Sequence, residues 1–175
     1  MRNLGDTKET ALLQKIVNQS DQLVGNMSEI IWAMNSKFDN LESTVAYIRR
    51  YAMEFLKDHR IQLSFDSSKV VNDFVLSSTQ RRNLLLVIKE ALNNIVKHAE
   101  ANQVKIDISS DAEQVSILVV DDGVGIKGGN VLGNGLENMN ERMESIGGTF
   151  KIAEQQKGTT LILNLGLNNH LTNSL

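Results

Sequence analysis

The chain has 175 residues, enough for one domain of ordinary size or for a domain of about 130 residues with a helical extension. Its formal charge of −3 comes from interspersed charges, so no basic stripe indicates a nucleic-acid surface and no polybasic segment indicates a lipid surface. Cysteine is absent, which excludes disulfides, thiolate catalysis and cysteine-ligated zinc, and no apolar run approaches the ~20 residues of a membrane span.

The first predicted element is a long helix from Asp6 to Asn35, which Asp6 and Glu9 can open as a capping box. Apolar side chains recur along it at alternating spacings of three and four. They are Leu13, Ile16, Leu23, Met27, Ile30 and Met34, with Ser20 in the same series and Val17, Val24 and Ile31 beside it. Such a stripe is too wide to leave in water, and no other segment carries a comparable heptad. The sequence therefore predicts a bundle with another copy of the chain or with a helix missing from it.

The rest of the chain alternates helical and strand-like patterns. Helices are predicted at Asp39–Lys57, opened by Asp39 and Glu42, and at Ser78–Ala99 and Leu136–Ile146. Strands are predicted at Ile61–Phe65, Gln103–Ser109, Gln114–Val120, Thr149–Ala153 and Thr159–Leu165. This order predicts an α+β fold, a two-layer α/β sandwich in which helices cover one face of a mixed sheet. The expected division is a bundle helix over 1–37, the sandwich over 38–167 and a disordered tail over 168–175.

A first polar cluster lies on the third predicted helix. Glu90 and Asn94 are four residues apart and share a face, and Lys97 and His98 lie one turn further along the same general direction. An asparagine amide is a hard oxygen ligand suited to Mg²⁺, which is held mainly through substrate phosphates. Glu90 could orient a metal-bound water or take a proton from an attacking group. The alternative for this cluster alone is an ordinary solvated helix face.

A second cluster follows a very apolar strand. The carboxylate of Asp121, at the end of Val115–Val120, would be partly buried and would need a hydrogen-bond donor. The exocyclic amine of adenine is such a donor, and Gly123 and Gly125 remove side chains so that the base can approach the backbone. The alternative is a tight turn at a strand end, where Asp and Gly are common.

A third cluster, Gly133-Asn134-Gly135-Leu136, opens the last predicted helix. The unsatisfied amides of a helix N-terminus form an anion site ready for phosphates, and the stretch from Ile126 to Leu132 would then be a lid over the nucleotide. No Gly-Lys-Ser or Gly-Lys-Thr occurs, and the Gly-x-Gly-x-x-Gly pattern fails at Asn138. These facts disfavour a P-loop and a dinucleotide-binding fingerprint.

The three clusters in this order resemble the ATP-binding domain with the Bergerat fold that is shared by DNA gyrase, the heat-shock chaperone, mismatch-repair ATPases and bacterial histidine kinases. Within that superfamily they resemble two-component sensor histidine kinases of the nitrate-sensor and membrane-fluidity-sensor class. Glu90–Ala99 looks like their N box, and Asp121–Gly125 resembles the G1 box. The G2 region of that family is similar to Gly133–Leu136 together with Met139, Glu141, Arg142 and Gly147-Gly148. The closing Gly-Thr motif is similar to Gly158-Thr159-Thr160.

This resemblance implies ATP and Mg²⁺ as cofactors and a role for each site residue. It implies Asn94 on Mg²⁺, Asp121 on adenine, Glu90 as the acid–base residue, Lys97 near phosphate and Thr159 near the adenine side. For His98 two interpretations stay open, an imidazole that flanks phosphate and a partly exposed structural histidine.

One departure from that family concerns the histidine that accepts the phosphoryl group, which is usually followed at once by an acidic residue. The histidines here and the residues after them are His59-Arg60, His98-Ala99 and His170-Leu171. None fits, and the long first helix looks like the second helix of a dimerisation hairpin, so the chain is expected to begin after the acceptor helix. It would then bind ATP without phosphorylating itself, since phosphoryl transfer depends on positioning.

The resemblance also implies the partners of a longer parent protein. The parent would form a homodimer through the helical bundle and pass its phosphoryl group to a response regulator receiver domain. It would be a bacterial inner-membrane sensor, with this part in the cytoplasm and no nucleic-acid partner.

Three alternatives accompany this interpretation. An anti-sigma-type serine kinase would lack the heptad helix, and a nucleotide-binding pseudokinase or assembly module would bind ATP and transfer nothing. A gyrase-like ATPase is disfavoured because the short gap between Gly125 and Gly133 leaves little room for the longer lids of that group.

Overall fold

The computed structural model describes residues 4–70, 74–126, 134–154 and 157–166. Its helices are α1 (Leu4–Met34), the 3₁₀ turn η1 (Ser36–Phe38), α2 (Leu41–Asp58), α3 (Ser78–Asn94), the π-helical turn η2 (Ile95–Ala99) and α4 (Gly135–Glu144). Its strands are β1 (Gln62–Lys69), β2 (Gln103–Ser110), β3 (Gln114–Asp121), β4 (Gly148–Glu154) and β5 (Thr159–Gly166). Gly133, most of the predicted lid and the tail at 168–175 lie outside the described residues.

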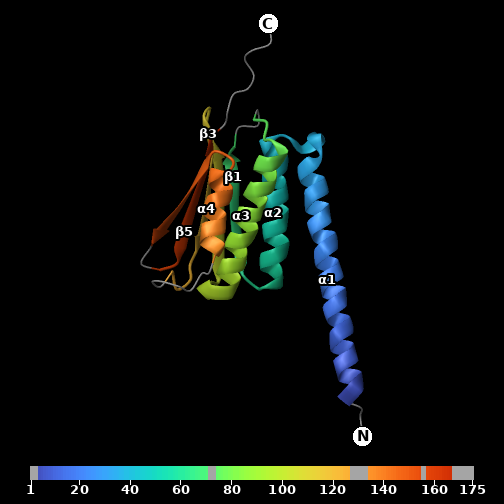
Figure 1. Ribbon diagram of the computed structural model, residues 1–175. Coiled ribbons are helices and arrows are strands. Elements are labelled where there is room, and N and C mark those ends of the chain that lie inside the picture. The colour runs from blue at the N-terminus through green and yellow to red at the C-terminus, as the bar shows by residue number, and fades with distance from the viewer. Residues whose placement is uncertain (1–3, 71–73, 127–133, 155–156, 167–175) are drawn as a thin grey trace.

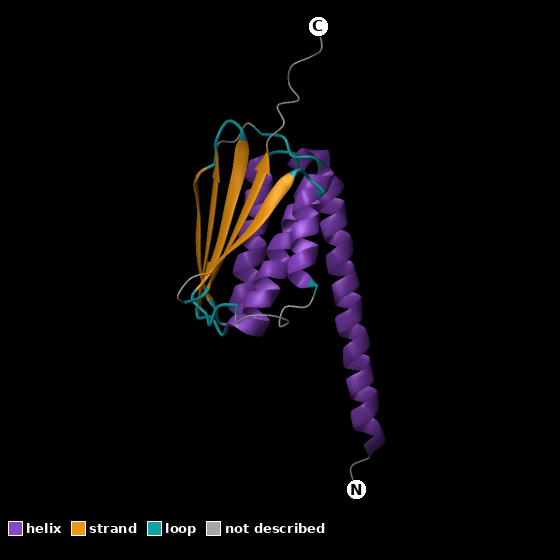
Figure 2. Ribbon diagram, turned by 60° about the vertical axis from the view of Figure 1, so that its left-hand side comes forward, coloured by secondary structure: helices purple, strands orange, loops and turns teal. Residues whose placement is uncertain are grey.

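The five strands form one mixed sheet in the order β1-β2-β3-β5-β4. The β1–β2 pair is parallel and the other pairs are antiparallel. Alternate residues of each central strand are buried, such as Ile106 in β2 and Ile117 in β3, because successive side chains of a strand point to opposite faces. Helices α2, α3 and α4 cover one face of the sheet and leave the other open (Figure 2). The predicted two-layer sandwich and the helix that precedes it are confirmed.

The first helix projects from this sandwich. Its N-terminal part extends past the end of the sandwich where α3 terminates (Figure 1). Most of the predicted apolar stripe is exposed, and its exposed members include Leu13, Ile16, Leu23, Met27, Ile30 and Met34. The last turns of α1 pack on the sandwich, where the Trp32 ring stacks on Tyr47 with 4.1 Å between centroids. The bundle partner of the stripe stays a prediction.

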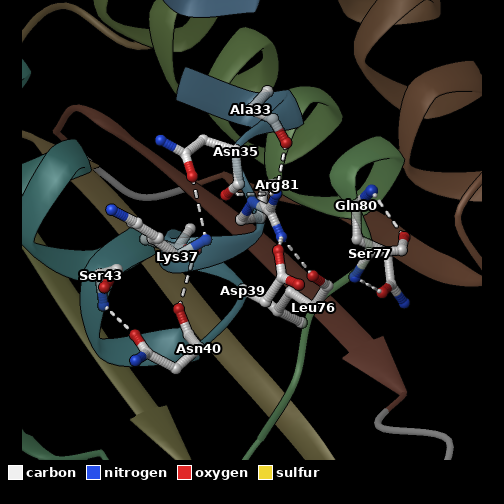
Figure 3. A network of polar contacts seen from close by, with 11 residues as sticks. Ala33, Asn35, Lys37, Asp39, Asn40, Ser43, Leu76, Ser77, Gln80 and Arg81 are labelled. Atoms are coloured by element: carbon white, nitrogen blue, oxygen red, sulfur yellow. Dashed lines mark hydrogen bonds and ion pairs between the residues drawn. The ribbon is translucent and has the colours of Figure 1, made fainter. Parts of the chain in front are cut away.

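The predicted capping pair of α2 is wrong. Helix α2 begins at Leu41, and its N-cap is Asn40, whose side-chain oxygen accepts a 2.8 Å hydrogen bond from the Ser43 amide (Figure 3). Asp39 does not cap α2, because its carboxylate instead pairs with the guanidinium of Arg81 from α3. By contrast, α3 opens with a complete capping box formed by Ser77 and Gln80.

Other boundaries also differ from the predictions. Helix α1 begins at Leu4, two residues before the predicted capping residue Asp6, and α4 ends at Glu144 rather than Ile146. Strand β1 runs to Lys69, four residues beyond the predicted end, because its polar second half pairs with β2 at the sheet edge. The third predicted helix is helical throughout 78–99, but its last five residues form a π turn.

Candidate functional site

A cavity of about 280 Å³ lies where α3 ends, between the end of β3, the start of β5 and the first turn of α4. It is lined by Ala91, Asn94, Ile95, His98, Ala99, Asp121, Val124, Gly125, Ile126, Leu136, Thr159 and Leu161. Residues from all three predicted clusters therefore meet in one place, although more than 60 residues separate Ala91 from Thr159 along the chain.

Asp121 is the buried carboxylate of this cavity. Its residue is only 5% exposed, and its Oδ1 accepts a 2.9 Å hydrogen bond from the Gly123 amide. Burial raises the pKa of the Asp121 carboxyl, while hydrogen bonds from Gly123 and Thr159 act in the opposite direction. A carboxylate that is short of solvent and borders a cavity is suited to accept a hydrogen bond from a bound ligand.

The adjacent Asp122 has a different environment. Its Oδ1 accepts hydrogen bonds from the backbone amides of Gln103 (2.9 Å) and Asn102 (2.8 Å), at the start of β2. These bonds, that of Gln103 first, hold the pKa of the Asp122 carboxyl below its ordinary value. Asp122 thus fastens β2 to the end of β3, and only Asp121 of the pair faces the cavity.

The glycines of this region are required by close backbone contacts. A Cβ on Gly123 would lie 2.1 Å from the Ala99 carbonyl oxygen, and one on Gly158 would lie 1.9 Å from the Asp121 carbonyl oxygen. Gly125 and Gly158 also have positive φ angles of 74° and 80°. Gly125 lines the cavity, as the sequence interpretation requires, but Gly123 serves mainly to let the strand-end loop pack against the end of α3.

Glu90 and Asn94 face the start of α4. A Cβ on Gly135 would lie 2.7 Å from Glu90 Oε1, so it would displace the Glu90 carboxylate, and 3.5 Å from Asn94 Nδ2, which is an ordinary contact distance. The amide nitrogen of Asn94 is buried and has no hydrogen-bond partner among the described residues. A buried amide without a partner is costly, and at the wall of a cavity it is well placed to meet a polar ligand.

The π turn at the end of α3 contains the other two residues of the predicted N-box cluster. His98 lines the cavity, while Lys97 is exposed and does not line it. The turn ends at Glu100 in the left-handed conformation, and its Ala99 carbonyl accepts a 2.8 Å hydrogen bond from the Val124 amide. Single π turns are frequent at functional sites because they re-aim side chains.

Sequence reasoning missed the apolar wall of the cavity, which includes Ala91, Ile95 and Leu161. Ala91, Asn94, Ile95 and His98 follow the spacing i, i+3, i+4, i+7, so this face could have been recognised from the sequence. Apolar members of such a face are otherwise indistinguishable from core residues.

The described residues contain no group of three or more His, Cys, Asp or Glu side chains that could hold a metal ion. Mg²⁺ commonly takes most of its ligands from bound phosphates and water, so it needs few ligands from the protein. Within the same residues, no helix has the length and apolar character needed to cross a membrane.

A second hollow, of about 410 Å³, lies on the open face of the sheet. Its lining is more polar and includes Gln62, Ser64, Lys105, Asp122 and Lys157. It shares Asp121 with the first cavity, its apolar lining is limited to Val104 and Val120, and the unpartnered Asn94 amide does not line it.

The chain belongs to the family of histidine kinase-, DNA gyrase B- and HSP90-like ATPases. The sequence pattern of that family matches residues 79–169, which are 91 of the 175 residues. The match begins in the first turn of α3 and includes every residue that lines the cavity.

Its curated relatives include several sensor histidine kinases. UhpB of Salmonella typhimurium, a signal transduction histidine-protein kinase/phosphatase, is 39% identical over 84 residues, which are 47% of this chain and 17% of the relative. The oxygen sensor histidine kinase NreB of Staphylococcus carnosus is 28% identical over 161 residues, which are 85% of this chain and 46% of the relative. The chain thus spans less than half the length of these relatives.

Solved structures share the fold at low identity. The histidine kinase AdeS of Acinetobacter baumannii superposes with a TM-score of 0.64 at 17% identity, covering 91% of this chain and 85% of the other. The histidine kinase domain of a blue-light activated kinase from Erythrobacter litoralis gives 0.59 at 19% identity, covering 90% and 84%. The sandwich is therefore the fold of the histidine kinase ATPase domain.

Proposed function

We propose that the chain is the ATP- and Mg²⁺-binding catalytic part of a two-component sensor histidine kinase. The observation that carries this proposal is the meeting of the buried Asp121 carboxylate and the unpartnered Asn94 amide in one cavity with apolar walls. Asp121 can accept a hydrogen bond from the adenine amine, and the apolar walls suit the faces of the base. Thr159 adjoins Asp121 and shares this adenine side.

The other end of the cavity suits the phosphates. The Asn94 side chain offers an amide oxygen to Mg²⁺, and the first turn of α4 at Gly135 and Leu136 directs backbone amides toward an anion. Bound Mg²⁺ would neutralise charge on the phosphates. We also assign Lys97 and His98 to this end, and we assign Gly123, Gly125 and Gly133 to the loops that would hold the nucleotide.

Glu90 is the proposed acid–base residue. Its carboxylate lies against the Gly135 backbone and four residues from Asn94 on the same helix, so it is close to the phosphate end without lining the enclosed cavity. A group in this place can orient an attacking imidazole and take its proton.

The proposed arrangement of the parent protein is based on α1. We assign residues 1–37 to the second helix of a dimerisation bundle and residues 38–167 to the ATP-binding domain. The exposed stripe supports this assignment, as does the histidine kinase identity of the relatives. The parent would dimerise through the bundle, phosphorylate a histidine outside this chain, and pass the group to a response regulator in the cytoplasm.

The nitrate-sensor class is supported by two relatives. They are NreB and the nitrate/nitrite sensor NarX of Escherichia coli, which is 29% identical over 91 residues, 51% of this chain and 15% of NarX. Neither the anti-sigma-type serine kinase nor the gyrase-like ATPase has comparable support, and a pure nucleotide-binding module is distinguished from a kinase by phosphoryl transfer.

Calorimetry with a non-hydrolysable ATP analogue tests the nucleotide site. The chain should bind the analogue more tightly with Mg²⁺ than without it, and Asp121→Asn should weaken binding by about 10- to 100-fold through loss of a charged hydrogen bond. Asp122→Asn is the matched control and should leave the affinity nearly unchanged. Absence of binding by the intact chain, or equal effects of the two substitutions, would contradict the proposal.

A further inference from the structure

Arg81, in the first turn of α3, is the most buried charged residue of the described chain, with 1% exposure. Figure 3 shows its guanidinium at the centre of a polar network. Nη1 donates to the Asp39 carboxylate and, at 2.6 Å, to the Leu76 carbonyl. Nη2 donates to the Ala33 carbonyl and, at 3.4 Å, to the Asn35 carbonyl. One side chain thus joins the end of α1, the turn before α2 and the segment before α3.

The end of α1 needs such a partner. The last carbonyl groups of a helix have no amide donor within the helix. They also form the negative end of the helix dipole, which favours a nearby cation. Helix α1 ends at Met34 with no basic residue in its last turn. Arg81 supplies the missing cation from another helix. Its planar fork can bond several acceptors at once, which a lysine ammonium on a flexible stem cannot match.

Two other contacts of α1 with the sandwich lie close to the same point. Glu29 forms an ion pair with Lys89 of α3, and Trp32 stacks on Tyr47 of α2. Further toward the N-terminus, the apolar side chains Leu23 and Val24 are more than 60% exposed. The residues from Glu29 to Met34 span about 9 Å of a 31-residue helix that is about 46 Å long.

Because α1 is long and attached near one end, a small change in its angle produces a large displacement of its other end. A tilt of about 10° at the attached end would move the far end by about 8 Å, given the 1.5 Å rise per residue. Reacting groups must meet within about 3.5 Å for a transfer to occur. Small changes at the attachment are therefore large compared with the tolerance of any reaction on a helix beside α1.

We propose that Arg81 is a positioning residue that fixes the direction in which α1 leaves the α/β sandwich. It acts on the helix end through the Ala33 and Asn35 carbonyls and is itself held by Asp39 and Leu76. The effect of Arg81 on phosphoryl transfer rests on the proposed function. The direction of α1 matters for transfer only if the acceptor histidine lies on a neighbouring helix of the bundle. The proposed role of Arg81 in setting the direction of α1 does not itself rest on nucleotide binding.

Spin-label distances test this inference. The chain contains no cysteine, so Gln19→Cys in α1 and Glu141→Cys in α4, both exposed, give two unique labels. Dilution with unlabelled chain removes distances between molecules. The labelled chain and its Arg82→Met control should share one narrow distance distribution, since Arg82 is the exposed neighbour of Arg81. Arg81→Met should shift or broaden that distribution by several ångströms. A folded Arg81→Met protein with the unchanged distribution would overturn the inference.

A second variant keeps the test decisive if Arg81→Met fails to fold. Arg81→Lys retains the positive charge but not the fork, and it should also broaden the distribution. An unchanged distribution in Arg81→Lys would then overturn the inference. ATP-analogue affinity in the folded variants should stay within about threefold of the parent chain, because the cavity lies at the opposite end of α3. Loss of nucleotide binding by every protein, with label distances as expected, would refute the proposed function and leave the role of Arg81 intact.

Discussion

The two ends of α3 are both polar, but they are completed in different ways. At the first turn, both terminal nitrogens of Arg81 are bonded to protein acceptors, and only its Nε lacks a partner among the described residues. At the last turn, the buried amide nitrogen of Asn94 lacks a partner and the Asp121 carboxylate borders a cavity. The first end is a structural joint between segments of the chain, whereas the second has polar groups that a ligand can complete.

This difference shows how to separate structural polar residues from ligand-binding ones. A buried polar group costs free energy unless it is hydrogen-bonded, so a network that the protein closes by itself needs no ligand to explain it. A buried polar group without a hydrogen-bond partner at the wall of a cavity does need a ligand to explain it. Substitutions at the two ends should accordingly affect different measurements.

The largest effect is expected for Glu90→Gln at the cavity end. With ATP and a supplied acceptor helix that carries a histidine followed by an acidic residue, phosphoryl transfer should fall by about 100-fold or more, because the general base is lost. Nucleotide affinity should change little, since Glu90 does not line the enclosed cavity. Glu113→Gln, an exposed carboxylate in the β2–β3 turn, is the control. Transfer at the parental rate by Glu90→Gln would show that another group takes the proton.

Glycine substitutions come next, because they test the backbone contacts behind the cavity. Gly158→Ala should lower the free energy of unfolding by about 3 kcal/mol or more, since it combines a positive φ with a Cβ that would lie 1.9 Å from the Asp121 carbonyl oxygen. Gly147→Ala, with a positive φ but open space, should cost about 1 kcal/mol. Gly166→Ala has neither problem and should be nearly neutral. Urea unfolding gives the order, and equal effects at the three positions would contradict the described backbone.

At the other end of α3, Asp39→Asn should destabilise the fold by about 1–2 kcal/mol. This carboxylate is 40% exposed, but its loss removes the only anionic partner that the structure shows for the buried Arg81 guanidinium. Glu42→Gln should cost less than about 0.5 kcal/mol, because Glu42 acts only through the helix dipole of α2. Thermal unfolding of the two variants compares them. If Glu42→Gln lowered the free energy of unfolding more than Asp39→Asn, that result would instead support the capping pair of Asp39 and Glu42 predicted from the sequence.

The smallest effect is a pH dependence that should have opposite signs at the two neighbouring aspartates. The folded pKa of Asp121 is raised, so the folded state binds more protons between the ordinary value of 3.8 and the raised value. The contribution of Asp121 to stability therefore falls as pH rises through that window. Without ligand, Asp121→Asn should gain stability relative to the parent chain as pH rises from below 3.8 to neutral.

Asp122 provides the comparison for this measurement. Its folded pKa is lowered, so its contribution is present above the ordinary value of 3.8 and is lost as pH falls through the lowered value. Asp122→Asn should thus be less stable than the parent chain at neutral pH and should approach it in acid. Urea unfolding at several pH values tests both variants, and slopes of the same sign would contradict the assigned environments.

The sequence predicted the elements of the sandwich because their patterns are local. The strand and helix patterns of β2, β3 and α3 each need only a few neighbouring residues. The capping box of Ser77 and Gln80 is equally local, but it was not among the predictions. The cap of α2 could not be predicted in this way. Asp39 and Asn40 are both good N-cap residues, and the choice between them depends on Arg81, 42 positions away from Asp39.

The candidate site shows the same limit. Motif residues such as Asn94 and Asp121 were recognisable as a set, and the structure brings them to one cavity. The structural reason for Gly123 could not be predicted. A side chain at this position would collide with the carbonyl group of Ala99, which is distant in sequence. The π turn that contains Lys97 and His98 has no local signal in the sequence either.

The most direct test of the central claim is a nuclear magnetic resonance titration of the ¹⁵N-labelled chain with a non-hydrolysable ATP analogue and Mg²⁺. The account predicts that the Asn94 side-chain amide and the backbone amides of Gly125 and Thr159 shift most, while the Arg81 end of α3 stays unchanged. Shifts that gather instead around Lys105 and Lys157 on the open face of the sheet, or no shifts at all, would contradict it.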